Sequence, residues 1–263
     1  MKTFKLIGMA LLFFATCVNF TACSSDDDPQ GEGEIENQTG KKISTISISY
    51  HSYGSKDKIA FLYNKKGLLS QVIIDGYSAT YEYQDNLITI TSGNKKIKAK
   101  LSNSRVELLS TNYESISYQY DKKGYLISAD NENTNYKFKW KDSNLLELDL
   151  MYSHENYYDF FKQTYDKQAP FYGFMALFAD SDNPFYRFLG GNDEMLFLFV
   201  AHPNLFGQPC KNGISQIEMT DAGGEEHHGD HQFISFEYDK KEYPTYIVEK
   251  EGNNKTTYNI TWE

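Results

Sequence analysis

The sequence predicts a mainly β protein, an antiparallel meander that forms a curved sheet or a partly closed barrel, capped by a short helical insert at about 169–207. Three observations predict this fold. Short runs alternate apolar and polar residues, one phrase recurs along the chain, and one continuous apolar stretch interrupts both patterns. Gly, Asn, Asp and Ser break the alternating runs about every eight to twelve residues, a spacing typical of antiparallel hairpins rather than of strand–helix–strand units.

Alternation with a period of two marks the expected strands. In Ile46–Tyr50, isoleucine and tyrosine alternate with serine, which indicates a strand with one buried face. Further runs of this kind lie at 79–84, 86–91, 96–101, 115–120 and 135–141.

The recurring phrase predicts a repeated hairpin. It reads "FLYNKKGLL" at 61–69, "YQYDKKGYL" at 118–126 and "FEYDKKEYP" at 236–244. Asp or Asn at the first turn position and Gly at the fourth are preferred in type I turns, and a left-handed Gly makes the bulge that starts the next strand in register. The third copy carries Glu242 in place of Gly, so this turn is expected to be of another type, because a non-Gly residue at positive φ is uncommon.

Aromatic residues recur at equivalent strand positions in these units. Phe61 with Tyr63 and Tyr118 with Tyr120 precede the first two turns, and further aromatic strands follow them. Because the positions repeat, most of these side chains are expected to form cross-strand pairs that stabilise the sheet. Stacking on sugar rings is the functional alternative.

Residues 169–207 interrupt the strand pattern. The segment is apolar and aromatic, is punctuated by proline, and predicts short helices near 172–179, 184–189 and 193–201. Such a segment must be covered, so packing against a curved sheet is expected. An aromatic lid over a ligand is the alternative.

Residues 1–22 predict a secretory signal peptide, since a short positive start precedes an apolar stretch from Ile7 to Val18. The stretch is shorter than the roughly 20 apolar residues of a spanning helix. Ala22 precedes Cys23, and the polar "SSDDD" follows at once. This arrangement is similar to a bacterial lipobox, in which the thiol of Cys23 receives a diacylglycerol.

The lipobox also predicts the domain organisation and the location. Residues 23–41 are the lipidated cysteine with an acidic, flexible tether, and residues 42–263 form a single β-rich domain. Ser and Asp directly after the cysteine resemble the export tag of surface lipoproteins in Bacteroidota. The chain is therefore expected at the bacterial outer membrane, anchored by lipid and exposed at the surface.

Charge and cysteine content restrict the classes of partner. The formal net charge is −10 at pH 7, which disfavours nucleic acid and docking on anionic lipid, so membrane contact is expected through the N-terminal lipid only. Beyond Cys23 only Cys210 remains, so an intramolecular disulfide and a thiolate metal cluster are excluded. Cys210 is expected to be a buried small hydrophobic residue.

The densest polar cluster is "GGEEHHGDHQF" at 223–233. Its imidazoles, those of His227, His228 and His231, are weak candidates for ligands of zinc or a similar ion. The accompanying carboxylates are those of Glu225, Glu226 and Asp230. Glycines surround the cluster between two strand-like runs, so a flexible hairpin tip is favoured and no cofactor is predicted.

The recurring phrase, the aromatic return strands and the "NPFY…LFG…KN" insert occur together behind the lipobox. This combination resembles a domain-of-unknown-function family of Bacteroidota lipoproteins with a porin-like antiparallel β fold and hairpins like those of YD repeats. The resemblance covers about 42–263 and implies the shape of the sheet. The family has no established catalytic residues to carry over. A channel is not inferred, because outer-membrane strands need a continuous apolar outer band and these strands are short and rich in lysine.

The function predicted from the sequence is that of a lipid-anchored cell-envelope protein, a non-enzymatic binding or scaffolding module at the outer surface. A glycan or an envelope protein is the expected partner type. The alternative is a cell-surface hydrolase of polysaccharide or peptide that uses the cluster at 225–231, and a purely structural envelope component is a third possibility. No phosphate-binding loop, nucleophile elbow or HExxH motif occurs in the sequence, so no catalytic residue is assigned.

Overall fold

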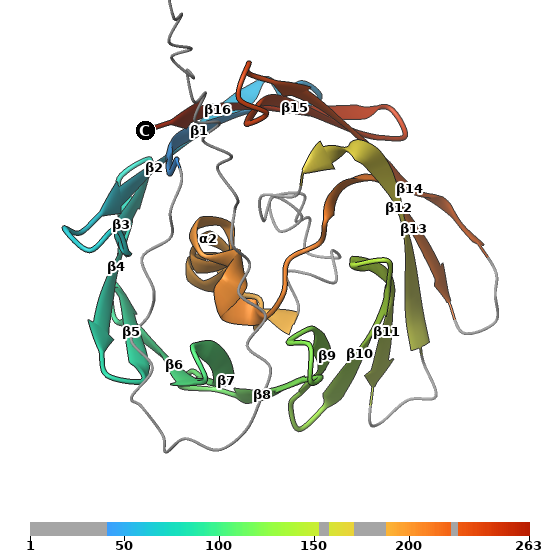
Figure 1. The fold of residues 1–263 in the computed structure, drawn as a ribbon. Coiled ribbons are helices and arrows are strands. Elements are labelled where there is room, and N and C mark those ends of the chain that lie inside the picture. Colours follow the sequence, from blue (N-terminus) through green and yellow to red (C-terminus); the bar gives the residue numbers. More distant parts are fainter. Residues whose placement is uncertain (1–40, 153–157, 171–187, 222–225) are drawn as a thin grey trace, which may run out of the picture. The chain divides into compact units, whose positions relative to one another are not determined.

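The computed structural model describes residues 41–152, 158–170, 188–221 and 226–263, all within one compact unit, Glu32–Glu263. For residues 152, 158–170, 219–221 and 226–231 only the backbone is considered. Figure 1 shows strands arranged as a ring around a helix.

The described elements are strands β1 to β16, one α-helix and one short 3-10 helix. The strands are β1 (Ile43–Tyr50), β2 (Ser55–Tyr63), β3 (Leu69–Ile74), β4 (Tyr77–Gln84), β5 (Leu87–Ser92), β6 (Lys95–Ser102), β7 (Arg105–Ser110), β8 (Ser115–Tyr120), β9 (Leu126–Asp130), β10 (Thr134–Lys141), β11 (Asn144–Tyr152), β12 (Tyr158–Pro170), β13 (Asn212–Asp221), β14 (Glu226–Tyr238), β15 (Pro244–Glu251) and β16 (Asn254–Trp262). The helices are α2 (Asp193–Ala201) and η2 (Pro203–Phe206).

The sheet is a closed antiparallel barrel. Each strand pairs with the next along the chain, and β1 pairs with both β2 and β16, which closes the ring. The closing register runs from Ile43 opposite Trp262 to Tyr50 opposite Thr256. The mainly β, antiparallel meander predicted from the sequence is confirmed, and the sheet is closed rather than open.

The inner face of the barrel is apolar and packs on α2. Phe61 of β2 lies edge-on to Phe197 of α2, with ring centroids 6.1 Å apart. Tyr118 of β8 lies edge-on to Phe188 just before the helix, at 6.5 Å. Residues 194–200 of α2 are all buried, as expected of a helix that is apolar on every side. The core therefore occupies the barrel interior.

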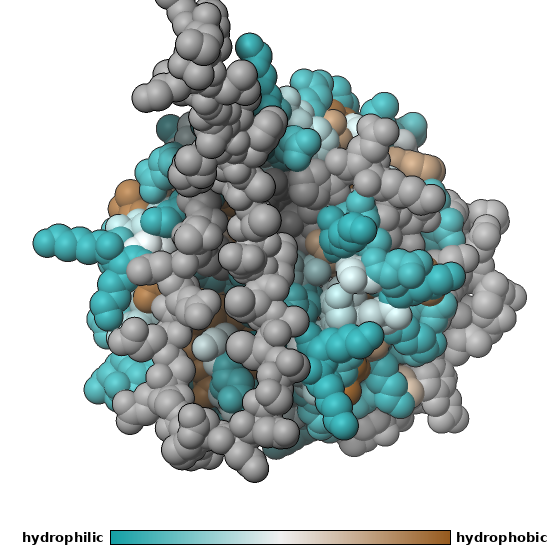
Figure 2. Space-filling model, viewed as in Figure 1, coloured by the Kyte–Doolittle hydropathy of each residue, from teal (hydrophilic) through white to brown (hydrophobic). Residues whose placement is uncertain are grey.

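The outer face of the barrel is polar. Lys96, Lys98 and Lys100 alternate with the buried residues of β6 and are exposed. Thr91 and Thr89 of β5 lie opposite the first two of these lysines. Figure 2 shows mainly hydrophilic residues around the outside of the described barrel in this view, with hydrophobic residues only scattered among them.

The predicted insert supplies the interior helix. Its third expected helix, 193–201, coincides with α2. The expected helix at 172–179 lies outside the described residues, as does most of the one at 184–189. Figure 1 places α2 within the ring, so the expected cap reaches into the barrel. In the part of the chain that is described, no helix is both long and apolar enough to cross a membrane.

The three copies of the recurring phrase form the same turn. In the second copy, the Asp121 carboxylate accepts hydrogen bonds from the amides of Lys123 and Tyr125, each at 2.9 Å. Gly124 has φ +87° and donates its amide hydrogen to the Asp121 carbonyl. Asn64 and Asp239 hold the other two turns in the same way.

The expectation of a different third turn is wrong. Glu242 takes φ +66°, close to the +78° of Gly67, and donates its amide hydrogen to the Asp239 carbonyl at 3.0 Å. The hydrogen bonds of Asp239 and the strand register on both sides fix the turn, so Glu242 accepts an unfavourable backbone conformation.

Substitutions at this fourth turn position should therefore change the free energy of unfolding in opposite directions. We expect Glu242→Gly to raise the free energy of unfolding by about 0.5–1 kcal/mol, and Gly124→Ala to lower it by about 1–2 kcal/mol. Denaturant unfolding of the purified chain measures both. Equal destabilisation by the two changes would contradict a shared left-handed turn.

Candidate functional site

One cluster of polar groups in the barrel interior surrounds Glu194 in the first turn of α2. Its side chain is only 3% exposed. The Tyr77 hydroxyl donates a hydrogen bond to one carboxylate oxygen, and the Lys95 ammonium lies 2.9 Å from the other. Tyr81 donates its hydroxyl hydrogen to the Glu194 backbone carbonyl at 2.8 Å. The partners come from the adjacent ends of β4 and β6, so this cluster fixes one end of the helix.

Two opposing effects set the pKa of the Glu194 carboxyl. Burial, the largest single effect, raises it, whereas the hydrogen bonds from Tyr77 and Lys95 lower it and together prevail, so the pKa lies below its ordinary value. The carboxylate is therefore charged and paired at neutral pH. A carboxyl group in this state is neither a general acid nor a free base, and the cluster has the character of a structural latch.

His202 fixes the other end of α2. Its Nε2 accepts a hydrogen bond of 2.9 Å from the backbone amide of Leu69 on β3, which places the ring proton on Nδ1. The ring lies edge-on to Tyr63, with centroids 6.2 Å apart. Burial, assisted by the charge of Lys42, lowers the pKa of His202 to about 4, so the imidazole is neutral at physiological pH.

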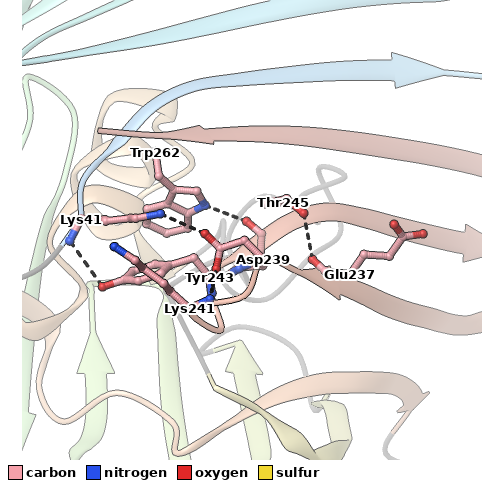
Figure 3. Close-up of polar contacts among 8 residues, drawn as sticks. Lys41, Glu237, Asp239, Lys241, Tyr243, Thr245 and Trp262 are labelled. Atoms are coloured by element: carbon pink, nitrogen blue, oxygen red, sulfur yellow. Dashed lines mark hydrogen bonds and ion pairs between the residues drawn. The ribbon is translucent and has the colours of Figure 1, made fainter.

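Lys41, at the end of the predicted tether, contacts the turn between β14 and β15 (Figure 3). The Lys41 ammonium lies 2.9 Å from an Asp239 carboxylate oxygen and 4.9 Å from the centroid of the Tyr243 ring. Hydrogen bonding from Lys41, reinforced by the Tyr243 amide, lowers the pKa of Asp239 to about 2. Trp262 donates its indole hydrogen to the Pro244 carbonyl at 2.7 Å and packs on Tyr243.

The same tryptophan arrangement occurs in the second hairpin unit. Trp140 donates its indole hydrogen to the Leu126 carbonyl at 2.7 Å and packs on Tyr125. The two tryptophans thus occupy equivalent positions in the barrel wall. The expected cross-strand pairing does not describe Phe61 and Tyr118, however, because their rings pack on Phe197 and Phe188 inside the barrel.

Comparison with known proteins gives a structural similarity but no family. No protein-family model and no curated protein sequence matched the chain. Among solved structures, a porin-like protein from Bacteroides uniformis superposes with a TM-score of 0.59 at 13% identity, over 84% of this chain and 98% of that chain. In fold, the chain is similar to that porin-like protein. The likeness supports the porin-like β fold that the resemblance implied, whereas membership of a particular lipoprotein family stays a prediction.

The residues singled out from the sequence have different outcomes. Cys23 lies outside the described residues, so its lipidation stays a prediction. Cys210 is buried, as predicted, with its sulfur 3.4 Å from the Leu145 amide. Among described residues, no group of three or more His, Cys, Asp or Glu side chains is placed to hold a metal ion.

The histidine cluster lies partly in a strand. His227, His228 and His231 belong to β14, and His231 lies opposite Glu218 of β13. The backbone therefore differs from the favoured hairpin tip, because β14 begins at Glu226 and the connection lies before it. Only the backbone of residues 226–231 is described, so metal binding by these histidines stays a weak prediction.

The sequence analysis did not single out Glu194, Lys95 or His202. A signal for Glu194 was present, because it precedes the apolar run "MLFLFV" of α2 and is followed by no further charge within the helix. A buried carboxylate requires a partner, but the sequence separates it from Lys95 by much of the barrel wall. Only closure of the sheet around α2 reveals the pair.

Acid should weaken the barrel through His202. Between pH 6.5 and about 4 the unfolded chain binds a proton on this side chain and the folded chain does not, so the free energy of unfolding falls as pH drops through this window. The loss is on the order of 2–3 kcal/mol. Denaturant titrations at several pH values measure it, and His202→Gln should flatten the dependence. An unchanged slope in that variant would contradict a buried neutral imidazole.

The latch should behave as a coupled pair. We expect Lys95→Met to lower the free energy of unfolding by about 1–3 kcal/mol, because it removes the cation from a buried carboxylate. In the presence of Glu194→Gln the same substitution should cost much less. A double-mutant cycle measures the coupling, and additive effects would show that the pair does not interact. Lys96→Met on the outer face of the same strand is the matched control.

Proposed function

We propose that the protein is a lipid-anchored cell-envelope protein whose barrel is a non-enzymatic binding or scaffolding module at the outer surface. One observation carries the proposal. The barrel is apolar inside, where α2 lies, and polar outside. This polarity suits a barrel that stands in water and is held at the membrane by a lipid on Cys23.

A pore would need the opposite distribution of side chains. Outer-membrane barrels carry an apolar outer band about 25 Å tall around a polar interior. Here the outer face carries ion pairs, such as Lys139 with Glu147 at 2.9 Å and with Asp149 at 3.2 Å. Charged groups at the level of the hydrocarbon core cost about 2–4 kcal/mol each, so insertion of this wall is opposed.

Exposed aromatic residues support a binding role at one end of the barrel. Tyr113, in the connection between β7 and β8, is 95% exposed, and Tyr53, between β1 and β2, is 82% exposed. Both connections lie at the end opposite Lys41, because they join an odd-numbered strand to the following even-numbered strand. Tyrosine combines an apolar ring with a hydroxyl, which suits a glycan or protein partner.

Anchoring is tested by fractionation of cells that express the full chain. Cys23→Ala should move the protein from the membrane fraction to the soluble fraction, since the acylated thiol is lost. Cys17→Ala is the matched control and should leave the protein at the membrane. Retention of the Cys23→Ala protein would contradict the lipid anchor.

The binding role is tested with the purified Cys23→Ala chain against glycans and envelope extracts. Binding that is lost on Tyr113→Ala or Tyr53→Ala, and retained on Tyr125→Phe at the other end of the barrel, would support this end as the site. Hydrolysis of a glycan or peptide in the same screen would instead favour the hydrolase alternative.

A further inference from the structure

The barrel topology sorts the connections between strands into two ends. Every strand is antiparallel to its neighbours, so all even-numbered strands end at one rim. The chain also enters the barrel there, because β1 begins at the rim where β16 ends, and Lys42 and Glu263 exchange backbone hydrogen bonds of 2.9 and 2.8 Å. We call this end the tether rim.

The lysines of the recurring phrase all lie at the tether rim. The phrase connects β2 to β3, β8 to β9 and β14 to β15, and each of these connections follows an even-numbered strand. Its lysines are exposed in all three copies: Lys65, Lys66, Lys122, Lys123, Lys240 and Lys241. A pattern that looks scattered along the sequence thus places three pairs of lysines at one rim, where they lie among acidic residues such as Asp85, Asp142 and Glu263.

The turns hold these lysines at fixed positions. In each copy an Asp or Asn side chain accepts two backbone hydrogen bonds, one from the amide of the second lysine and one from the amide two residues later, between 2.8 and 3.1 Å. The backbone below the charges is therefore rigid. Binding at the rim therefore requires no further ordering of the backbone in these turns.

The opposite rim has a different balance of charge. Its described connections and adjoining strand ends carry acidic residues beside its lysines, among them Asp75, Glu114, Glu132 and Glu251. The net charge of −10 refers to the whole chain and does not describe the balance of charge at either rim.

We propose that the tether rim docks on the phosphate-bearing headgroups of the membrane that carries the Cys23 lipid. This inference rests on the proposed anchoring, because the lipid decides which rim faces the bilayer. Residues 24–40 separate Cys23 from Lys41. A flexible segment of that length spans about 23 Å on average, and about 60 Å when fully extended. The rim is thus kept within reach of the headgroups.

Lysine at a fixed rim is suited to this partner. Its compact ammonium interacts with phosphate as a point charge and needs no shaped pocket. Each lysine near an anionic surface strengthens binding roughly fivefold, and the effect is confined to about a Debye length. The acidic residues of the tether oppose the attraction, so the contribution of the rim must be measured between variants that share one tether.

The experiment uses the full chain with Cys23→Ala, so that no acyl chain contributes. Co-sedimentation compares vesicles of pure phosphatidylcholine with vesicles that contain phosphatidylglycerol, at low and at high salt. The rim variant Lys66→Gln, Lys123→Gln and Lys241→Gln removes one lysine from each copy. The control variant Lys56→Gln, Lys96→Gln and Lys255→Gln removes the same charge from exposed positions at or near the opposite rim.

We expect the protein with the unsubstituted rim to bind vesicles that contain phosphatidylglycerol more strongly than vesicles of pure phosphatidylcholine. This difference should disappear at high salt. The rim variant should bind on the order of 100-fold more weakly, and the control variant within about threefold of the parent. Circular dichroism and thermal unfolding verify that both variants keep the fold.

Three results would overturn the inference: equal binding to both vesicle types, equal losses in the rim and control variants, or rim-dependent binding to an acidic polysaccharide without binding to vesicles. The anchoring proposal fails separately, through membrane retention of Cys23→Ala in cells. The two failures are therefore distinguishable.

Discussion

Burial of α2 is the constraint on which the rest of the structure depends. A helix that is apolar on every side has no face to present to water, so it requires a surface that surrounds it. A flat sheet covers one side of such a helix, whereas a closed barrel surrounds it with apolar side chains. Closure in turn requires β1 to reach β16 and dictates that the aromatic residues of the repeated strands point inward.

Polar contacts at the two ends of α2 complement the apolar contacts along it. Dispersion and the hydrophobic effect favour a filled lumen but do not define the position of the helix along the barrel axis, because they have no direction. Glu194 at one end and His202 at the other supply that direction through hydrogen bonds to β4, β6 and β3. A latch at each end fixes both the depth and the rotation of the helix.

The sequence predicted local features well and long-range ones poorly. Alternation and turn chemistry identified the strands, the hairpin turns and α2, because neighbouring residues decide those features. Closure joins residues at opposite ends of the chain, such as Ile46 and Ile260, and no local pattern reports that pairing. At Glu242, a prediction from local preference was wrong. Its own preference argued against the left-handed turn, yet Asp239 and the strand register prevailed.

The net charge of a chain does not predict the local charge at each end of its fold. An acidic chain was expected to avoid anionic lipid, and that expectation treats the charge as uniform. An up-and-down barrel with turn lysines after even-numbered strands cannot be uniform, since alternation of strand direction sends all of those turns to one rim. The recurring phrase therefore has two separable parts. Its Asp or Asn and the left-handed fourth residue build the hairpin, while its lysines are not needed for the turn and are free to serve the surface that the barrel presents at that rim.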